Sequence, residues 1–216
     1  MKYSAVLFDF DYTLGDATPS IYQGFCYAFE NMGLPQPGLD QVRRTVGHTL
    51  QDAYTMLTGD ADAQRREECR RWFHEKVRGR QAAMTLLLPG ARELLQALHQ
   101  SGVKVGIVTS KHSATLQEIL DRYGLGPLLD FTVGGEGVSA PKPDPEGLNA
   151  GISALGVARD KVLYCGDTTI DAATAQNGGV DFAAVLGGTT PAGDFEGYPR
   201  VHIAPDLMEL KNWLGV

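Results

Sequence analysis

Residues 85–216 alternate between short apolar runs and helix-forming stretches, and this alternation constrains the fold more than any other feature of the sequence. Mainly apolar stretches of strand length occur at 103–108, 131–133 and 162–165, and a continuous apolar run lies at 6–8. Continuous apolar runs of this length are typical of strands covered on both faces. Strands that alternate with helices form a parallel sheet with helices on both faces. We therefore expect an α/β fold with a Rossmann-like parallel core.

The segment from 16 to 84 interrupts this alternation, because every periodic stretch within it is helical. Ile21 and Phe25 begin an apolar series at helical spacing, and the stretch from 62 to 84 is rich in charged residues. A charge run of this kind is typical of a helix with a solvated face. We expect two domains: an α/β core of residues 1–15 and 85–216, and an all-helical domain of residues 16–84 inserted after the first strand.

Polar side chains follow three of the expected strands at the point where each strand ends. Asp9 and Thr109 come directly after apolar runs, and Asp167 follows another after one glycine. The carboxyl ends of parallel strands meet at one edge of the sheet, where ligands bind in folds of this kind. The helical domain follows the first strand directly, so we expect it to lie over that edge and cover a site there.

Four carboxylates are expected to converge at this edge: Asp9, Asp11, Asp167 and Asp171. Close like charges destabilise one another unless a cation joins them or one of them takes a proton. Oxygen ligands without histidine or cysteine favour Mg²⁺ over Zn²⁺. Asp167 or Asp171, taken individually, could instead be the N-cap of a helix. That alternative does not account for the whole set, which predicts a magnesium site.

The overall charge limits the classes of partner. The formal net charge is −7, which argues against a nucleic acid or an anionic membrane, because both are bound mainly by basic patches. A small phosphate compound remains compatible, since a metal ion, one lysine and backbone N–H groups can bind it. No run is long enough to span a bilayer and no signal peptide is evident, so we expect a cytoplasmic protein.

Several other kinds of site are not supported by the sequence. The three cysteines are far apart, and the five histidines have no zinc-binding spacing. We expect free thiols rather than disulfides or a catalytic cysteine. The glycine-rich segment 134–137 matches neither the P-loop nor the dinucleotide-binding pattern, so we interpret it as a turn.

Four motifs resemble those of the haloacid dehalogenase superfamily, and they occur in its order along the chain. They are the D-x-D-x-T motif at 9–13, the hydroxyl residue after a strand at Thr109, K-P-x-P at 142–145, and G-D-x-x-x-D at 166–171. The insertion point of the helical domain is similar to that of the superfamily's C1-type cap. Within the superfamily, the chain is similar to the phosphoglycolate phosphatase and β-phosphoglucomutase branch.

This resemblance implies a role for each motif residue. Asp9 would attack phosphorus and form an aspartyl phosphate, and Asp11 would act as general acid and then as general base. Mg²⁺ would be bound by Asp9, the backbone carbonyl of Asp11, and Asp167, with Asp171 orienting this set. The residues expected to contact the phosphate group are Thr13, Thr109, Ser110, Lys142 and, from the cap, His48.

For three of these residues, an interpretation without a role in phosphate binding stays open. Thr13 could only cap the loop after Asp11, Ser110 could be a helix N-cap, and His48 could be a surface residue. Tyr12 stands where glycine is common in the phosphoglycolate phosphatase branch, although the position varies across the superfamily.

Asp11 distinguishes branches of the superfamily, because dehalogenases and phosphonate hydrolases of similar layout lack this second aspartate. The resemblance therefore implies a phosphatase of a small phosphorylated metabolite, with a monomer or homodimer expected. One alternative is a sugar phosphomutase, which returns the phosphoryl group to a sugar; the T-S-K segment at 109–111 resembles the phosphatase branch instead. Another alternative is a non-catalytic binding domain, although no motif residue is missing.

Overall fold

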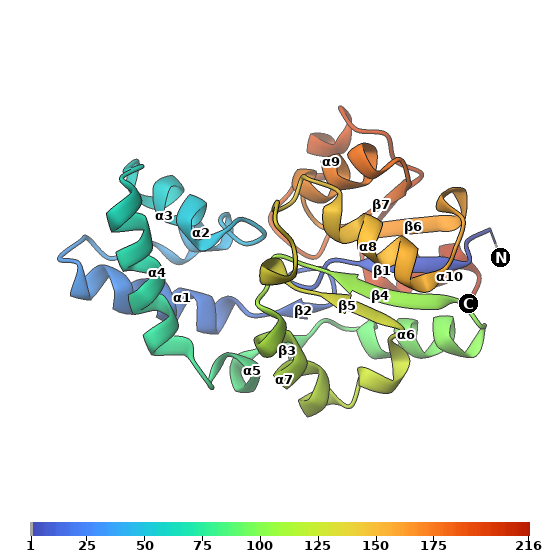
Figure 1. Ribbon diagram of the computed structural model, residues 1–216, viewed down its shortest axis with the longest axis horizontal. Helices are drawn as coiled ribbons and strands as arrows, with labels where there is room; N and C mark the ends of the chain where they lie inside the picture. Colours follow the sequence, from blue (N-terminus) through green and yellow to red (C-terminus); the bar gives the residue numbers. More distant parts are fainter. Residues whose placement is uncertain (1) are drawn as a thin grey trace. The chain divides into compact units, whose positions relative to one another are not determined.

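The chain divides into two compact units in the computed structural model, which describes residues 2–216 (Figure 1). Unit 1 comprises Met1–Asp16 and Leu87–Val216, and unit 2 comprises Ala17–Leu86. Each unit has its own hydrophobic core. We describe the two units separately.

Unit 1 is built on a six-stranded sheet in which every paired neighbour is parallel, so the predicted α/β fold is confirmed. The strand order is β5-β4-β1-β6-β7-β8. The strands are β1 (Ala5–Phe8), β4 (Lys104–Val108), β5 (Phe131–Val133), β6 (Val162–Gly166), β7 (Asp181–Val185) and β8 (His202–Ala204). The carboxyl ends of β4, β1 and β6 therefore lie next to one another.

Helices cover both faces of this sheet (Figure 1). They are α6 (Ala91–Gln100), α7 (Ser113–Tyr123), α8 (Glu146–Leu155), α9 (Thr169–Gly178) and α10 (Leu207–Leu214). Figure 1 shows α8 and α9 on one side and α6 and α7 on the other, and α10 contacts α6. Four short 3₁₀ turns complete the unit: η1 (Gly126–Leu128), η2 (Gly135–Gly137), η3 (Arg159–Lys161) and η4 (Ala192–Phe195).

The central strand β1 is fully buried because helices lie on both sides of it. All four of its side chains are completely shielded from solvent. Leu7 packs with Leu148 of α8 and Tyr164 of β6, while Val6 and Phe8 point to the opposite face by strand alternation. Full burial of an aliphatic or aromatic side chain contributes roughly 1.5–3 kcal/mol. This burial anchors the strand that carries Asp9 at its end.

Unit 2 is all-helical. Its helices are α1 (Thr18–Asn31), α2 (Leu39–Arg43), α3 (Leu50–Thr58), α4 (Ala63–Val77) and α5 (Gln81–Met84). Its core is formed largely by aromatic rings of α1, α3 and α4. The ring centroids of Phe25 and Phe73 are 5.1 Å apart, and those of Phe29 and Tyr54 are 6.3 Å apart. A two-stranded sheet of β2 (Gly15–Asp16) and β3 (Leu86–Leu87) lies where the chain leaves unit 1 and returns to it.

The charged stretch from 62 to 84 is not one continuous helix. It forms α4 and α5, which are separated at Arg78–Arg80, where Gly79 has a φ of +67°. Glycine adopts this left-handed conformation at little steric cost, which explains the break. Helix α4 otherwise fits the expectation, because only Cys69, Phe73 and Val77 along it are buried.

Two further sequence expectations are met. All three cysteines are free. Among residues 2–216, no helix has both the length and the apolar character needed to cross a membrane.

Candidate active site

The loop that follows β1 carries the two aspartates of the first motif. Asp9 is buried, and its backbone N–H donates a hydrogen bond to the carbonyl of Cys165 on the neighbouring strand (2.9 Å). The chain then turns back sharply, since the carbonyl of Phe10 accepts the N–H groups of Leu14 and Gly15. Tyr12 sits in this turn with a φ of +60°, the one positive φ at a non-glycine position in residues 2–216. A glycine at this position would adopt the same conformation more easily.

Three buried carboxylates meet beneath this loop. Asp9, Asp167 and Asp171 each offer an oxygen, and these oxygens lie within 4.8 Å of one another. Asp167 follows β6, and Asp171 lies in the first turn of α9. The structure thus brings together carboxylates from two adjacent strand ends, as the sequence predicted. The Asp11 side chain is not part of this cluster.

Lys142 lies against the carboxylate cluster. Its ammonium group is 3.0 Å from Asp9 Oδ1 and 2.7 Å from Asp171 Oδ1, and the side chain is almost completely buried. Asp171 is fixed further by Thr168, whose hydroxyl donates to Asp171 Oδ2 (2.6 Å) in a capping box at the start of α9. The position of Lys142 beside Asp9 therefore depends on a carboxylate that is itself held by a helix N-terminus.

The pKa values of these groups reflect burial and crowding. Burial raises the pKa of Asp9 from 3.8 to about 6; Lys142 opposes this shift, whereas Asp171 and Asp11 add to it. Burial, together with Asp171 and Asp9, raises the pKa of Asp167 well above its usual value. Burial alone would lower the pKa of Lys142, but the carboxylates of Asp171 and Asp9 raise it well above its usual value. One lysine therefore does not offset the negative charge of the cluster.

A divalent cation fits this cluster on two grounds. The converging atoms are carboxylate oxygens, the ligands that Mg²⁺ prefers. In addition, Asp9 Oδ1 is buried and forms no hydrogen bond of good geometry, although the Lys142 ammonium lies nearby. A buried oxygen without a hydrogen bond costs about 1–3 kcal/mol unless another group takes its place.

The other residues expected at the site occupy different positions. The hydroxyl of Thr13 donates to Asp167 Oδ1 (3.3 Å), so Thr13 joins the carboxylate cluster directly. Thr109 is buried at the end of β4, and its hydroxyl accepts the N–H of Lys111 (3.3 Å). Ser110 follows in the same loop. His48 belongs to unit 2, where it lies between α2 and α3 with an exposed side chain.

The alternative of Ser110 as a helix N-cap is wrong. Helix α7 begins at Ser113, and the residue that caps it is His112, whose ring accepts the N–H of Ala114 (3.3 Å).

Sequence reasoning missed four residues that shape this site. Lys111 forms a buried ion pair with Asp11, at 2.9 Å between Nζ and Oδ2. The Tyr164 hydroxyl lies 2.9 Å from the Val108 carbonyl and 3.1 Å from Asp171 Oδ1. It therefore links the carboxylate cluster to the end of β4.

The other two missed residues are glycines in the loop after β7. A Cβ atom at Gly187 would lie 2.1 Å from the carbonyl oxygen of Tyr12, and one at Gly188 would lie 2.0 Å from Asp167 Oδ2. Only glycine allows this loop to approach the site so closely. The pair Gly187-Gly188 in the sequence was the signal available for it.

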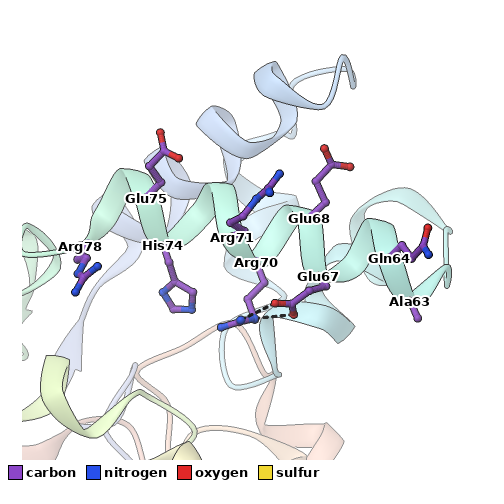
Figure 2. Close-up of a pocket in the computed structure, with 9 residues that line it drawn as sticks. All are labelled: Ala63, Gln64, Glu67, Glu68, Arg70, Arg71, His74, Glu75 and Arg78. Atoms are coloured by element: carbon purple, nitrogen blue, oxygen red, sulfur yellow. Dashed lines mark hydrogen bonds and ion pairs between the residues drawn. The ribbon is translucent and has the colours of Figure 1, made fainter.

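A separate hollow of about 930 Å³ runs along α4 in unit 2 (Figure 2). Its lining side chains carry charges of both signs, and Arg70 forms two hydrogen bonds with Glu67 (2.8 and 2.6 Å). Figure 2 shows His74 on this helix and Arg78 directly after its end. Because opposite charges already pair on it, this surface has the character of the solvated helix face expected from the sequence.

The sequence matches the haloacid dehalogenase-like hydrolase family over residues 6–185. A phosphoglycolate phosphatase from Cereibacter sphaeroides is 32% identical over 182 residues, which cover 82% of this chain and 83% of that protein. The pyrophosphatase PpaX from Halalkalibacterium halodurans is 28% identical over 213 residues, or 97% of each chain.

Solved structures agree with this match. A crystal structure from Bacteroides fragilis, described as a haloacid dehalogenase-like hydrolase, superposes with a TM-score of 0.93 at 36% identity. It covers 96% of this chain and 99% of that one. The resemblance inferred from the four motifs is therefore confirmed, and the chain belongs to the haloacid dehalogenase-like hydrolase family.

Proposed function

We propose that this hydrolase is a Mg²⁺-dependent phosphatase that cleaves a small phosphorylated metabolite through an aspartyl-phosphate intermediate. The observation that carries the proposal is the buried Asp9 carboxylate, which lies between Lys142 and two further carboxylates, with Asp11 two residues away on the same loop. The names of the relatives, phosphoglycolate phosphatase and pyrophosphatase, support a phosphate-containing substrate.

In the first step, a carboxylate oxygen of Asp9 forms a bond to phosphorus while the bond from phosphorus to the leaving oxygen breaks. Asp11 donates its proton to that oxygen, so the first product leaves as an alcohol. In the second step, Asp11 takes a proton from water, and the water oxygen attacks phosphorus. The bond to Asp9 breaks, and inorganic phosphate leaves with both aspartates restored for the next cycle.

The charge balance of the site explains why a divalent cation belongs to this proposal. Four aspartates face two buried lysines, Lys111 and Lys142. When all are ionised, two negative charges remain in excess. Asp9, Asp167 and the backbone carbonyl of Asp11 would bind Mg²⁺, and Asp171 would orient this set. When bound, the ion supplies the positive charge that an anionic phosphate needs at this position.

The chain's own residues would hold the transferred phosphoryl group. Lys142 lies beside the attacking carboxylate and can neutralise charge on the phosphoryl oxygens. Thr109 and Ser110, at the end of β4, supply hydroxyl groups on the neighbouring strand. Stabilisation by groups already held in place is the main contribution a protein makes to phosphoryl transfer.

Unit 2 would act as a cap and would determine which phosphate ester is accepted, with His48 as a candidate contact. A cap of this kind excludes water during the attack on phosphorus and readmits it for the second step. The substrate itself would be a small phosphorylated metabolite.

The decisive test is the variant Asp9→Asn. We expect hydrolysis of p-nitrophenyl phosphate in the presence of Mg²⁺ to fall by at least about 10³-fold, because the nucleophile is removed. Addition of EDTA to the wild-type protein should abolish activity, and MgCl₂ should restore it. Phosphate release is measured directly, so that transfer to a second substrate molecule would be recognised.

The matched control is Lys104→Met. Lys104 forms an exposed ion pair with Asp130 (2.7 Å) on the same sheet, remote from the carboxyl ends of the strands. We expect its activity to equal that of the wild type. Full activity of Asp9→Asn would refute the proposed function.

A further inference from the structure

Lys111 is a buried lysine for which the proposed chemistry has so far given no role. Only 3% of its side chain is exposed, and its ammonium group lies 2.9 Å from Asp11 Oδ2. A buried charge is strongly destabilising unless it is paired. The pairing of Lys111 with Asp11 therefore fixes both side chains relative to each other.

The two oxygens of Asp11 have different surroundings as a result. Oδ2 faces the Lys111 ammonium. Oδ1 is buried and has no hydrogen-bond partner within residues 2–216. A buried oxygen in this condition is an available site for a donor or acceptor from outside the chain. The ion pair thus holds the carboxylate in an orientation that leaves one defined oxygen free.

The backbone around Lys111 is held by the glycine-rich segment 134–137. The N–H of Gly135 donates to the Lys111 carbonyl (3.0 Å), and the N–H of Ser113 donates to the Glu136 carboxylate (2.8 Å). Neither glycine has space for a side chain. A Cβ atom at Gly134 would lie 2.5 Å from the Lys111 carbonyl oxygen, and one at Gly135 would lie 2.6 Å from that of Ser110. The segment that the sequence identifies only as a turn therefore fixes the loop that carries Lys111.

We propose that Lys111 is a positioning residue for proton transfer: it anchors Oδ2 of Asp11 so that Oδ1 faces the leaving oxygen of the substrate. This inference rests on the proposed function, because Asp11 is the general acid only in that reaction. No bond to Lys111 forms or breaks, and the proton passes from Asp11 to the leaving group as before.

Proton donation matters most when the leaving oxygen is basic. p-Nitrophenolate is a stable anion and departs with little help, whereas phenolate is more basic and depends more on the acid. The value of kcat/KM covers the steps up to departure of the first product. It therefore reports this dependence even if the second step limits kcat.

The test compares kcat/KM of Lys111→Met on phenyl phosphate and on p-nitrophenyl phosphate, both with saturating MgCl₂. We expect the loss on phenyl phosphate to exceed the loss on p-nitrophenyl phosphate by about tenfold, within the range of general-acid contributions. Lys111→Arg, which keeps the charge, should recover part of the loss on phenyl phosphate. Equal losses on the two esters would show a merely structural role and overturn the inference.

A double-mutant cycle with Asp11→Asn gives a second, independent measurement. If Lys111 acts through Asp11, then Lys111→Met should reduce kcat/KM on phenyl phosphate by less than about twofold in the Asp11→Asn background. Multiplicative losses in the double variant would contradict the proposal. Both proteins in this comparison carry Asp11→Asn. A loss of stability caused by Asp11→Asn therefore affects both and does not change the ratio of their kcat/KM values.

Two further variants separate the possible causes of failure. Lys104→Met removes an ion-paired lysine elsewhere on the sheet and should leave both esters unaffected. Gly135→Ala should displace the Lys111 loop and show the same preference for p-nitrophenyl phosphate as Lys111→Met. If the wild type hydrolysed neither ester, or Asp9→Asn kept its activity, the phosphatase itself would be refuted. An active wild type with equal losses in Lys111→Met would refute only the role of Lys111.

Discussion

At the scale of single residues, the buried carboxylates of the site repel one another, and a bound cation would weaken this repulsion. Asp9 and Asp167 are buried close together, and both have raised pKa values. A carboxylate with a raised pKa binds its proton more tightly in the folded protein than in the unfolded chain. Folding therefore becomes less favourable as the pH rises through the pKa of the folded state. The effect should be greatest in protein without metal.

The first prediction concerns the dependence of stability on pH. In EDTA, the wild type should lose stability as the pH rises from about 4 through 6, where Asp9 ionises, and further as Asp167 ionises. Asp167→Asn should show a smaller loss over the same interval, because its amide does not ionise. Mg²⁺ should raise the melting temperature of the wild type more at pH 7.5 than at pH 5, since protons compete for the same oxygens.

Thermal unfolding, followed by circular dichroism across this pH range with EDTA or MgCl₂, measures both effects. Asp167→Asn should also need at least about tenfold more Mg²⁺ for the same stabilisation, since it loses a charged ligand. Asp194→Asn, at an exposed aspartate in η4, is the control and should behave as the wild type. The same pH slope in wild type and Asp167→Asn would contradict the explanation.

At the scale of elements, the site depends on loops that follow neighbouring strands and fit closely together. The loop after β7 passes so near to the loop after β1 that only glycine fits at positions 187 and 188. Gly188 does not adopt a left-handed conformation, so its requirement comes from this close approach and not from backbone strain. The carboxylate that it touches is Asp167.

The second prediction is that Gly188→Ala impairs metal binding by displacing Asp167. Its Cβ would lie 2.0 Å from Asp167 Oδ2, which forces the carboxylate or the loop to move. We expect the Mg²⁺ concentration for half-maximal activity to rise about tenfold or more, in the range seen when the support of a metal ligand is lost. Titration of activity with MgCl₂ measures this change. Gly193→Ala, where a Cβ meets no atom within 4 Å, should leave the titration unchanged.

The elements that carry the motifs could be predicted because their signals are local. An apolar run that ends in a polar residue predicts a buried strand, and strands do end directly before Asp9, Thr109 and Asp167. The break between α4 and α5 was missed, although Gly79 was available as a signal. A glycine inside a charged helical pattern is compatible with one continuous helix or with a break between two helices.

The residues that support the site could not be predicted, because their roles depend on distant parts of the chain. Lys111 is indistinguishable in sequence from a solvated loop lysine; its buried ion pair with Asp11 forms only because the loops after β1 and β4 lie side by side. Tyr164 has the pattern of an ordinary core residue on a strand. Its hydroxyl contacts Asp171 and Lys142 only because the fold brings the first turn of α9 and the loop before α8 to it.

At the scale of the whole molecule, the buried apolar clusters described for unit 1 and for unit 2 share no residue. The core of unit 2 depends on close packing between α1 and α4. Gly24 of α1 lies against the Phe73 ring, which would be 2.5 Å from a Cβ at that position. A substitution here should therefore affect unit 2 before it affects the sheet.

The third prediction is that Gly24→Ala destabilises unit 2 by about 1–3 kcal/mol, the usual cost of overpacking a core. In an open helix, alanine in place of glycine would instead stabilise by roughly 0.5–1 kcal/mol. Hydrogen exchange should accelerate in residues 17–86 while the protected amides of β1, β4 and β6 keep their rates. Gly126→Ala, which meets no atom within 4 Å, serves as the control. Uniform acceleration in both units would show that they unfold together.

The central position of β1 has a consequence for synthesis on the ribosome. This strand is made before both of its neighbours, which begin at Lys104 and Val162. At ordinary rates of translation, β1 therefore waits on the order of ten seconds for its second partner. Unit 2, whose helices contact one another locally, can fold during that interval and draw β2 and β3 together at its ends. A nascent chain that stalls before Val162 would present the unpaired backbone N–H and C=O groups along one edge of β1 to chaperones, or to another stalled copy.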